Sequence, residues 1–325
     1  MDNQNPNSNG NPYGNSGGNP YGNPYGNPNG NPYGNTYGNP YGAPYPMPGY
    51  PLSNADLKQI AKRSLTGHYG TMIGISLLLS LFSMVITYLF NFIGNQLFLM
   101  CAVTFETDSE ILRYGISFVL SFISSLISCL FTVGNAKAFI QLLYGQPVHV
   151  SMLFYGFKNH PDRVMLSNIP LILITLILSV PATIYSEMYL EYAYEYLDAI
   201  ENMGTVFTPE TLPVMHSSMM LMALLSMAAS VALIFVTLHF AMINYLLVEM
   251  EDTSPKDIIR TGFAMMKGHK GRYFGLIVSF IGWTLLGIFT CGIGLIWVVP
   301  YQQATFAAFY LDLKRVHQQR QQAEY

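Results

Sequence analysis

The sequence predicts an all-α fold: a polytopic integral membrane bundle of six transmembrane helices, with amphipathic interfacial helices at the cytoplasmic surface. Three observations lead to this prediction. Apolar residues make up 51% of the chain and charged residues only 10%, against about 25% in ordinary soluble domains. The apolar residues gather in long runs. The basic residues gather in alternate connections between those runs, as they do in multi-pass membrane proteins.

Six apolar runs are each about as long as a membrane crossing, which needs roughly 20 residues. They cover about residues 71–98, 115–144, 164–185, 219–248, 273–289 and 293–311. Only Thr290, Cys291 and Gly292 separate the last two runs, so we expect a tight hairpin there. We also expect Pro300 to kink or break the helix that follows this hairpin.

The basic residues predict the orientation of the chain. Fourteen of the fifteen Lys and Arg residues precede the first run, lie in or near the second and fourth connections, or follow the last run. Arg113 alone lies in the first or third connection. By the positive-inside rule, both termini are therefore cytoplasmic. A chain with five crossings would place the basic tail outside, so the charge pattern also favours a sixth crossing.

The chain divides into an arm (residues 1–52), a six-span membrane domain (53–313) and a short cytoplasmic tail (314–325). In the arm, nine consecutive tetrads occupy residues 11–46, and five of them read Asn-Pro-Tyr-Gly, an order that suits type I turns. A string of turns has no apolar face to bury, so we expect a disordered, low-complexity arm. Two roles stay open: a solvated spacer, or spaced tyrosines that bind protein partners or one another.

A second repeat lies in the membrane domain. A shift of 201 residues aligns Asp56 with Asp257 and Gly67 with Gly268. Each copy predicts a capped amphipathic helix of about 12 residues, a Gly-His-x-Gly break in which glycine adopts a positive φ, and then a membrane span. The expected apolar stripe of the first helix consists of Leu57, Ile60, Ala61, Ser64 and Leu65.

A weaker third copy precedes the third apolar run. Its expected stripe is Val150, Leu153, Phe154 and Phe157. We expect Gly156, His160 and Pro161 to interrupt this helix. The predicted architecture is therefore three units, each an interfacial helix followed by a hairpin of two spans.

The residues of these repeats resemble a known family. The likeness is carried by Gly67-His68-Tyr69-Gly70 and, more specifically, by Met266-Lys267-Gly268-His269-Lys270, Phe280-Ile281-Gly282-Trp283 and the stretch 300–310. These stretches are similar to the bacterial multi-pass membrane proteins grouped as domain of unknown function 975, over about residues 54–313. The resemblance implies a protein of the bacterial cytoplasmic membrane. It implies no catalytic residues, because the activity of that family is not established.

Two sets of polar residues are candidates for function. His239, Asn244 and Gln302 lie within predicted spans and are candidates for a polar path, because a histidine at membrane depth is costly unless it is paired. A hydrogen bond between helices is the other interpretation of His239. The second set, a candidate contact for an anionic lipid headgroup, consists of Lys267, His269, Lys270 and Arg272. Positive-inside anchoring alone is the simpler interpretation of the second set.

The sequence contains no motif that predicts catalysis, a cofactor or a metal site. His-Glu-x-x-His, Cys-x-x-Cys and Gly-x-Ser-x-Gly do not occur. Of the three cysteines, Cys101 and Cys291 fall near the predicted outer face, where a bridge between them is one option. We expect a non-enzymatic scaffold or regulatory membrane protein whose partners are membrane lipids and proteins bound by the arm, with no nucleic acid. A transporter or channel for a small solute is the alternative.

Overall fold

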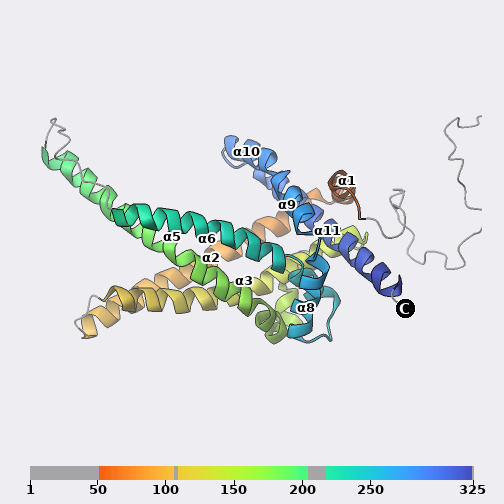
Figure 1. The fold of residues 1–325 in the computed structure, drawn as a ribbon, viewed down its shortest axis with the longest axis horizontal. Helices are drawn as coiled ribbons and strands as arrows, with labels where there is room; N and C mark the ends of the chain where they lie inside the picture. The colour runs from red at the N-terminus through yellow and green to blue at the C-terminus, as the bar shows by residue number, and fades with distance from the viewer. Residues whose placement is uncertain (1–50, 106–108, 204–216, 324–325) are drawn as a thin grey trace, which may run out of the picture. The chain divides into compact units, whose positions relative to one another are not determined.

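The computed structural model describes residues 51–105, 109–203 and 217–323, and within these ranges every regular element is helical (Figure 1). These helices belong to one compact unit, Pro44–Tyr325. In chain order they are α1 (Asn54–Leu65), α2 (Tyr69–Phe105), α3 (Glu110–Leu143), the 3-10 helix η1 (Val150–Phe154), α4 (Tyr155–Lys158), α5 (Pro161–Met203), α6 (Ser217–Phe240), α7 (Ile243–Glu249), α8 (Pro255–Met266), α9 (Lys270–Val278), α10 (Ile281–Phe289) and α11 (Leu295–Ala323). Residues 1–50 of the predicted arm lie outside the described ranges.

Five helical segments of the described chain are long and apolar enough to cross a membrane. They are Tyr69–Phe105, Glu110–Leu143, Pro161–Asp198, Ser217–Glu249 and Lys270–Phe289. The segment predicted as a sixth crossing lies in α11 and is not among them, since Tyr301, Gln302 and Gln303 lower its hydropathy. Pro300 lies inside α11 without ending it: the helix continues to Ala323.

The predicted repeat of 201 residues is confirmed by the geometry of the two copies. Both α1 and α8 have 12 residues. After each helix a glycine takes the left-handed conformation, with φ +84° at Gly67 and +82° at Gly268. The buried residues of the two helices also correspond one for one. These are Leu57, Ala61, Ser64 and Leu65 in α1, and Ile258, Gly262, Met265 and Met266 in α8.

The third copy differs from the prediction. Instead of one amphipathic helix, it consists of the 3-10 helix η1 and the single turn α4. Gly156 does not interrupt a helix, as we had expected; it lies within α4 and is buried against α3. A Cβ at Gly156 would lie 2.3 Å from the carbonyl oxygen of Leu130, so only glycine allows α4 to approach α3 this closely. The chain turns at His160, with φ +49°, before Pro161 begins α5.

The short helical segments pack in a cyclic order. Helix α1 packs on α11, the segment η1–α4 packs on α3, and α8 packs on α5, α6 and α7. Figure 1 shows α1 beside α11 and the long helices α5 and α6 side by side. Each short segment therefore rests on the last helix of the unit before it, and the first unit rests on the last. This order closes the three units into one structure.

The core lies where the short segments meet α3, α7 and α11. Its largest fully buried side chains include Phe139, Phe309, Tyr310 and Leu57. Most apolar side chains along α2 and α6 are instead exposed, for example Met84 at 65% and Met227 at 63%. Apolar side chains on the outside of a bundle are expected where lipid, and not water, surrounds the helices.

Candidate functional site

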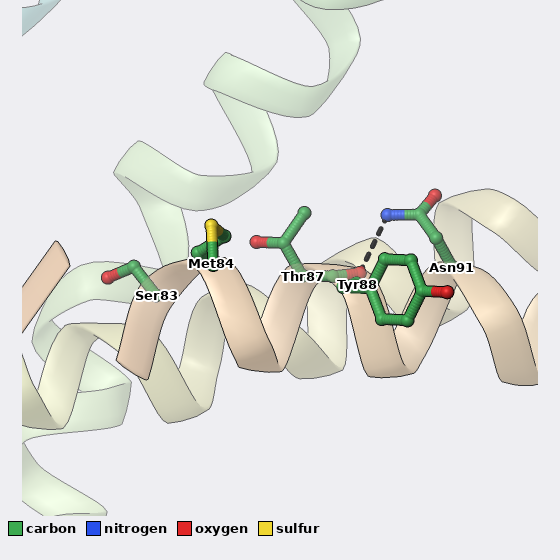
Figure 2. Close-up of a pocket in the computed structure, with 5 residues that line it drawn as sticks. All are labelled: Ser83, Met84, Thr87, Tyr88 and Asn91. Atoms are coloured by element: carbon green, nitrogen blue, oxygen red, sulfur yellow. Dashed lines mark hydrogen bonds between the residues drawn. The ribbon is translucent and has the colours of Figure 1, made fainter. Parts of the chain in front are cut away.

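A shallow hollow on α2 is lined, within the described chain, by side chains from that helix alone. Its lining residues are Ser83, Met84, Thr87, Tyr88 and Asn91, and Figure 2 shows them along one side of the helix. The side-chain amide of Asn91 donates a hydrogen bond to the carbonyl oxygen of Thr87 at 2.8 Å. Because no second element contributes to the lining, the hollow does not bring reactive groups together.

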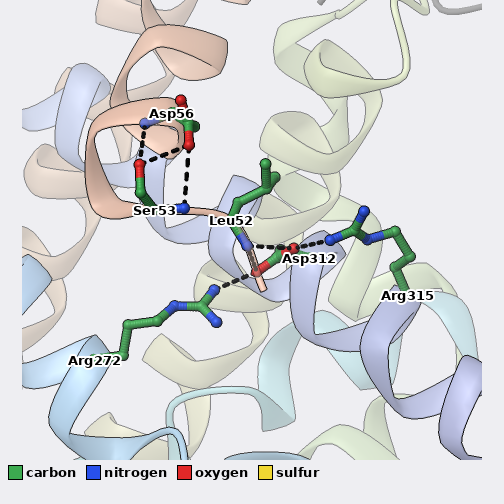
Figure 3. Close-up of polar contacts among 6 residues, drawn as sticks. All are labelled: Leu52, Ser53, Asp56, Arg272, Asp312 and Arg315. Carbon is green, nitrogen blue, oxygen red and sulfur yellow. Dashed lines mark hydrogen bonds and ion pairs between the residues drawn. The ribbon is translucent and has the colours of Figure 1, made fainter. Parts of the chain in front are cut away.

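A buried carboxylate on α11 joins three parts of the chain, which we call the Asp312 node. The side chain of Asp312 is fully buried. It accepts hydrogen bonds from the backbone N–H of Leu52, at 3.1 and 3.2 Å, and from Nη2 of Arg315, at 2.9 Å. Arg272, at the start of α9, forms an ion pair with the same carboxylate and lies 4.5 Å from the centroid of the Phe309 ring. Figure 3 shows these partners converging on Asp312.

The first turn of α1 is fixed beside this node (Figure 3). Ser53 and Asp56 form a capping box, in which each backbone N–H donates to the other side chain at 3.2 Å. In α8 the backbone N–H of Asp257 donates to Oγ of Ser254 at 3.3 Å, so the cap is repeated. Since Leu52 directly precedes the cap, the Asp312 node holds the start of α1 against α11.

A second carboxylate joins the last helices of all three units, and we call it the Glu249 node. Glu249 ends α7 and accepts hydrogen bonds from the hydroxyl groups of Tyr310, at 2.5 Å, and Tyr144, at 2.7 Å. Nζ of Lys314 forms an ion pair with it at 2.8 Å. Tyr144 follows α3, and Tyr310 and Lys314 belong to α11. The ends of α3 and α7 and the middle of α11 therefore meet at one carboxylate.

Arg163 fastens the start of α5 to the end of α7. Arg163 is only 8% exposed, and its Nη2 donates to the carbonyl oxygen of Leu247 at 2.7 Å. Nη1 donates to the carbonyl oxygens of Met250 and Glu251, which follow α7. A guanidinium at this position satisfies carbonyl groups that have no partner within the helix and interacts favourably with the negative end of the helix dipole.

Two further contacts complete this end of the bundle. The hydroxyl group of Tyr155 donates to the Glu251 carboxylate at 2.5 Å. Burial and then this hydrogen bond raise the pKa of Tyr155 to about 12. Lys58, on α1, donates to the carbonyl oxygen of Ser279 at 3.3 Å and lies 4.6 Å from the centroid of the Phe280 ring. Burial lowers the pKa of Lys58.

The structure does not bring the three candidate polar-path residues together: His239 has partners of its own, and Gln302 is half-buried in α11. Nδ1 of His239 pairs with the carbonyl oxygen of Phe235 at 2.7 Å, so this nitrogen carries the proton, and Nε2 accepts from the ammonium group of Lys270. The amide oxygen of Asn244 is buried and has no hydrogen-bond partner among the described residues. Among the hydrogen bonds and ion pairs of the described chain, none joins His239 to Asn244 or to Gln302.

The four candidate lipid contacts divide between inward and outward positions. Arg272 is engaged with Asp312, and Lys270 with His239. Lys267 follows α8 directly and is exposed. His269 precedes α9 and is half-buried, with an interaction of its own. The basic cluster therefore serves first to hold α9 to α6 and α11, and Lys267 is its exposed member.

The nodes at Asp312, Glu249 and Arg163 were not predicted as site residues. A signal for the first exists in the sequence, because Asp312 is an acid flanked by Leu311 and Leu313 on the side of the membrane that basic residues dominate. Counting basic residues alone gives no weight to such an acid. The partners of Arg163 are backbone carbonyl groups, which no sequence pattern specifies.

A further ion-paired cluster links the start of α3 to the second half of α5. Arg113 pairs with Glu110 at 2.6 Å and with Glu187 at 2.9 Å. Tyr114 donates to the same Glu187 carboxylate. Arg113, the one basic residue that lies apart from the other fourteen in the charge pattern, thus pairs with acidic side chains. These side chains are about one-third exposed or more, so the pairs are worth at most about 1 kcal/mol each.

Within the described chain, no group of three or more His, Cys, Asp or Glu side chains is placed to hold a metal ion. Cys101, Cys129 and Cys291 are free thiols. The arrangement described above joins helices through hydrogen bonds and ion pairs. Its charged and hydroxyl groups face one another across helix ends and not into a shared cavity.

Comparison with known proteins adds a family. The model of a family described as "Protein of unknown function (DUF975)" matches residues 47–317, which include all twelve described helices almost to the end of α11. Searches of curated proteins and of solved structures found no match. The match covers most of the chain and extends over the repeat, the three nodes and the long apolar helices. The chain therefore belongs to the DUF975 family of proteins of unknown function.

Proposed function

We propose that this protein is a non-enzymatic scaffold of the bacterial cytoplasmic membrane whose cytoplasmic face binds anionic lipid headgroups. The observation that carries the proposal is that the basic residues of α1, α8 and α9 fall into two groups. Some pair with carboxylates and carbonyl groups inside the protein, and these contacts hold the three units together. The others are exposed on the same short helices, where they can meet lipid.

The exposed basic residues lie on the two copies of the repeat. They are Lys62 and Arg63 in α1, Lys256 and Arg260 in α8, and Lys267 directly after α8. The apolar stripes of both helices are buried within the protein, so the exposed basic side chains are the groups that can meet an anionic membrane surface. Each basic residue near such a surface contributes about 1 kcal/mol to binding. Five of them are enough to select anionic lipid over neutral lipid.

The proposed topology has six crossings, with both termini in the cytoplasm. The contact between Leu52 and Asp312 supports it, because these residues flank all the crossings and yet lie at the same depth. An even number of crossings must then separate them. The two helices before and after the turn at 290–294 supply the fifth and sixth crossings, the last of which is the first half of α11.

The lipid proposal is tested by lipid retention. The full chain is purified in mild detergent from vesicles that contain phosphatidylglycerol and phosphatidylcholine in equal amounts, and bound lipid is identified by mass spectrometry. We expect phosphatidylglycerol to be enriched. Replacing the five exposed basic residues by Gln should remove the enrichment, whereas exchanging Lys for Arg and Arg for Lys at the same positions should preserve it. No enrichment in the parent protein, or equal enrichment in the Gln variant, would contradict the proposal.

A solute path is the second candidate function, favoured by unpartnered polar atoms inside the bundle. The side-chain oxygens of Asn135, Gln141 and Asn244 are buried and lack hydrogen-bond partners within the described chain. These residues lie near one end of the long apolar segments Glu110–Leu143 and Ser217–Glu249, where buried polar groups often line a hydrated path. If flux of a small solute is found in proteoliposomes, His239→Leu should abolish it. Retained flux would remove the histidine from the path.

Protein partners are proposed for the arm. Seven of the nine tetrads contain a tyrosine and none carries a charge, as expected of a segment that makes many weak contacts. Deleting residues 1–50 and comparing the proteins captured with each form tests this. An unchanged set of captured proteins would leave the arm as a spacer.

A further inference from the structure

Polar side chains form a seam along the outward side of α2. Leu81, Met84, Tyr88, Asn91 and Asn95 follow one another at alternating intervals of three and four residues, so they share one side of the helix. All five are exposed, Met84 at 65% and Tyr88 at 74%. Three of them are polar. Figure 2 shows Met84, Tyr88 and Asn91 of this seam along one side of α2.

The depth of Asn91 follows from how α2 packs on α3. The rings of Phe82 and Phe131 stack with centroids 5.0 Å apart, and a Cβ at Gly94 would lie 3.2 Å from the Leu120 side chain. The two helices are antiparallel, so Asn91 lies level with about residues 122–123 of α3.

The charged residues of α3 then place that level within the membrane. Arg113 and Lys137 are separated by about 36 Å along the helix at 1.5 Å per residue. The level of Asn91 is about 14 Å from Arg113 and about 22 Å from Lys137 by the same measure. The hydrocarbon region is about 30 Å thick. An α2 that crosses the membrane therefore holds Asn91 inside the hydrocarbon and not at the headgroups.

Asn91 is incompletely satisfied at that depth. Its amide nitrogen donates one hydrogen bond, to the carbonyl oxygen of Thr87 in the same helix. Within the described chain its amide oxygen accepts none. Hydrocarbon offers no water to a polar group, and such residues almost always face a protein surface and not lipid. The seam therefore requires a polar, uncharged partner at the same depth.

We propose that the partner is a second copy of this chain, so that two α2 helices pair along the seam into a symmetric dimer. A two-fold axis normal to the membrane places each residue of the seam at the same depth as the same residue of the second copy. A side-chain amide carries both a donor and an acceptor, so Asn91 of one copy can satisfy Asn91 of the other. The residues of α2 include no Lys, Arg, Asp or Glu, so no like charges oppose this pairing. The alternating spacing suits a left-handed pair of helices.

The test measures association in liposomes. Fluorescently labelled full chain is reconstituted over a range of protein-to-lipid ratios, and the dimer fraction is counted by single-molecule photobleaching. We expect Asn91→Leu to raise the dimer dissociation constant about tenfold, the effect of losing a hydrogen bond between helices in a membrane. Asn91→Gln keeps an amide and should stay near the parent value. Ile93→Leu, an exposed change on the side of the helix away from the seam, is the matched control and should have no effect.

Cross-linking tests the seam independently of stability. In a chain whose own three cysteines are replaced by Ala, Tyr88→Cys should form a disulfide-linked dimer on oxidation, and Leu89→Cys, one position off the seam, should not. A parent protein that stays monomeric at every protein-to-lipid ratio would overturn the proposal. So would an Asn91→Leu variant with an unchanged dissociation constant, or equal cross-linking at positions 88 and 89.

Discussion

The backbone N–H of Leu52 donates a hydrogen bond to the buried carboxylate of Asp312, 260 residues further along the chain. Leu52 precedes the first helix and Asp312 lies in the last. Arg272 brings the start of the fifth long apolar segment to the same carboxylate. A single acid thus fixes the beginning and the end of the membrane domain in one place.

Removing this acid should destabilise the protein strongly. In Asp312→Ala, the guanidinium groups of Arg272 and Arg315 lose their carboxylate, and breaking a buried ion pair from one side costs about 3–5 kcal/mol. We expect a clear fall in the thermal unfolding midpoint of the purified protein. The exposed Glu195→Gln in α5 is the control and should change the midpoint little. A midpoint equal to that of the parent would show that the node does not hold the helices.

The close approach of η1 and α4 to α3 should depend on glycine. A Cβ at Gly134 would lie 2.2 Å from the carbonyl oxygen of Leu153, a backbone atom that cannot move without shifting η1. We expect Gly134→Ala to cost about 1–3 kcal/mol, as overpacking does. Gly115 lies in the same helix, and a Cβ there would meet no atom within 4 Å in the described chain beyond the local helix backbone. We expect Gly115→Ala to be neutral or stabilising, since Ala favours a helix by up to about 1 kcal/mol. Thermal unfolding of the two variants separates packing from helix propensity.

The contact between Tyr155 and Glu251 should make the protein less stable as the pH rises from about 10 to about 12. Burial first, and then the hydrogen bond, raise the pKa of Tyr155 to about 12, so folding favours the neutral phenol. This contribution is complete below the ordinary tyrosine pKa of about 10 and is lost as the pH rises through about 12. We expect Tyr155→Phe to remove part of the stability loss in that window. Denaturation midpoints measured from pH 9 to about 12 test this, with the exposed Tyr194→Phe as control.

Thiol labelling should report the proposed topology in whole cells. Cys291 is exposed in the turn before α11, and we expect a membrane-impermeant maleimide to label it from outside. Gln318→Cys, in a chain without other cysteines, should be labelled only after the cells are opened, because six crossings return the tail to the cytoplasm. Labelling of residue 318 in intact cells would mean an odd number of crossings.

Sequence alone determined the helical class, the 201-residue repeat and its details. Periodic apolar residues, serine caps and glycines at helix ends act over a few neighbouring positions. The helices α1 and α8, and the apolar face that each buries, could therefore be predicted. The third copy was predicted less well. Gly156 was read as a helix breaker by its conformational preference, whereas the backbone of Leu130, distant in sequence, requires a glycine there for space.

Only the tertiary structure decided which charges are structural. Arg272 and Lys267 are equally basic neighbours of one Gly-His motif, and their sequence context does not distinguish them. Packing turns Arg272 toward Asp312 and leaves Lys267 exposed. Likewise His239 meets Lys270 and not Gln302, because α6 and α9 lie side by side. Local preferences specify helices and their caps, but the partner of a buried polar group depends on long-range packing that brings distant parts of the chain together.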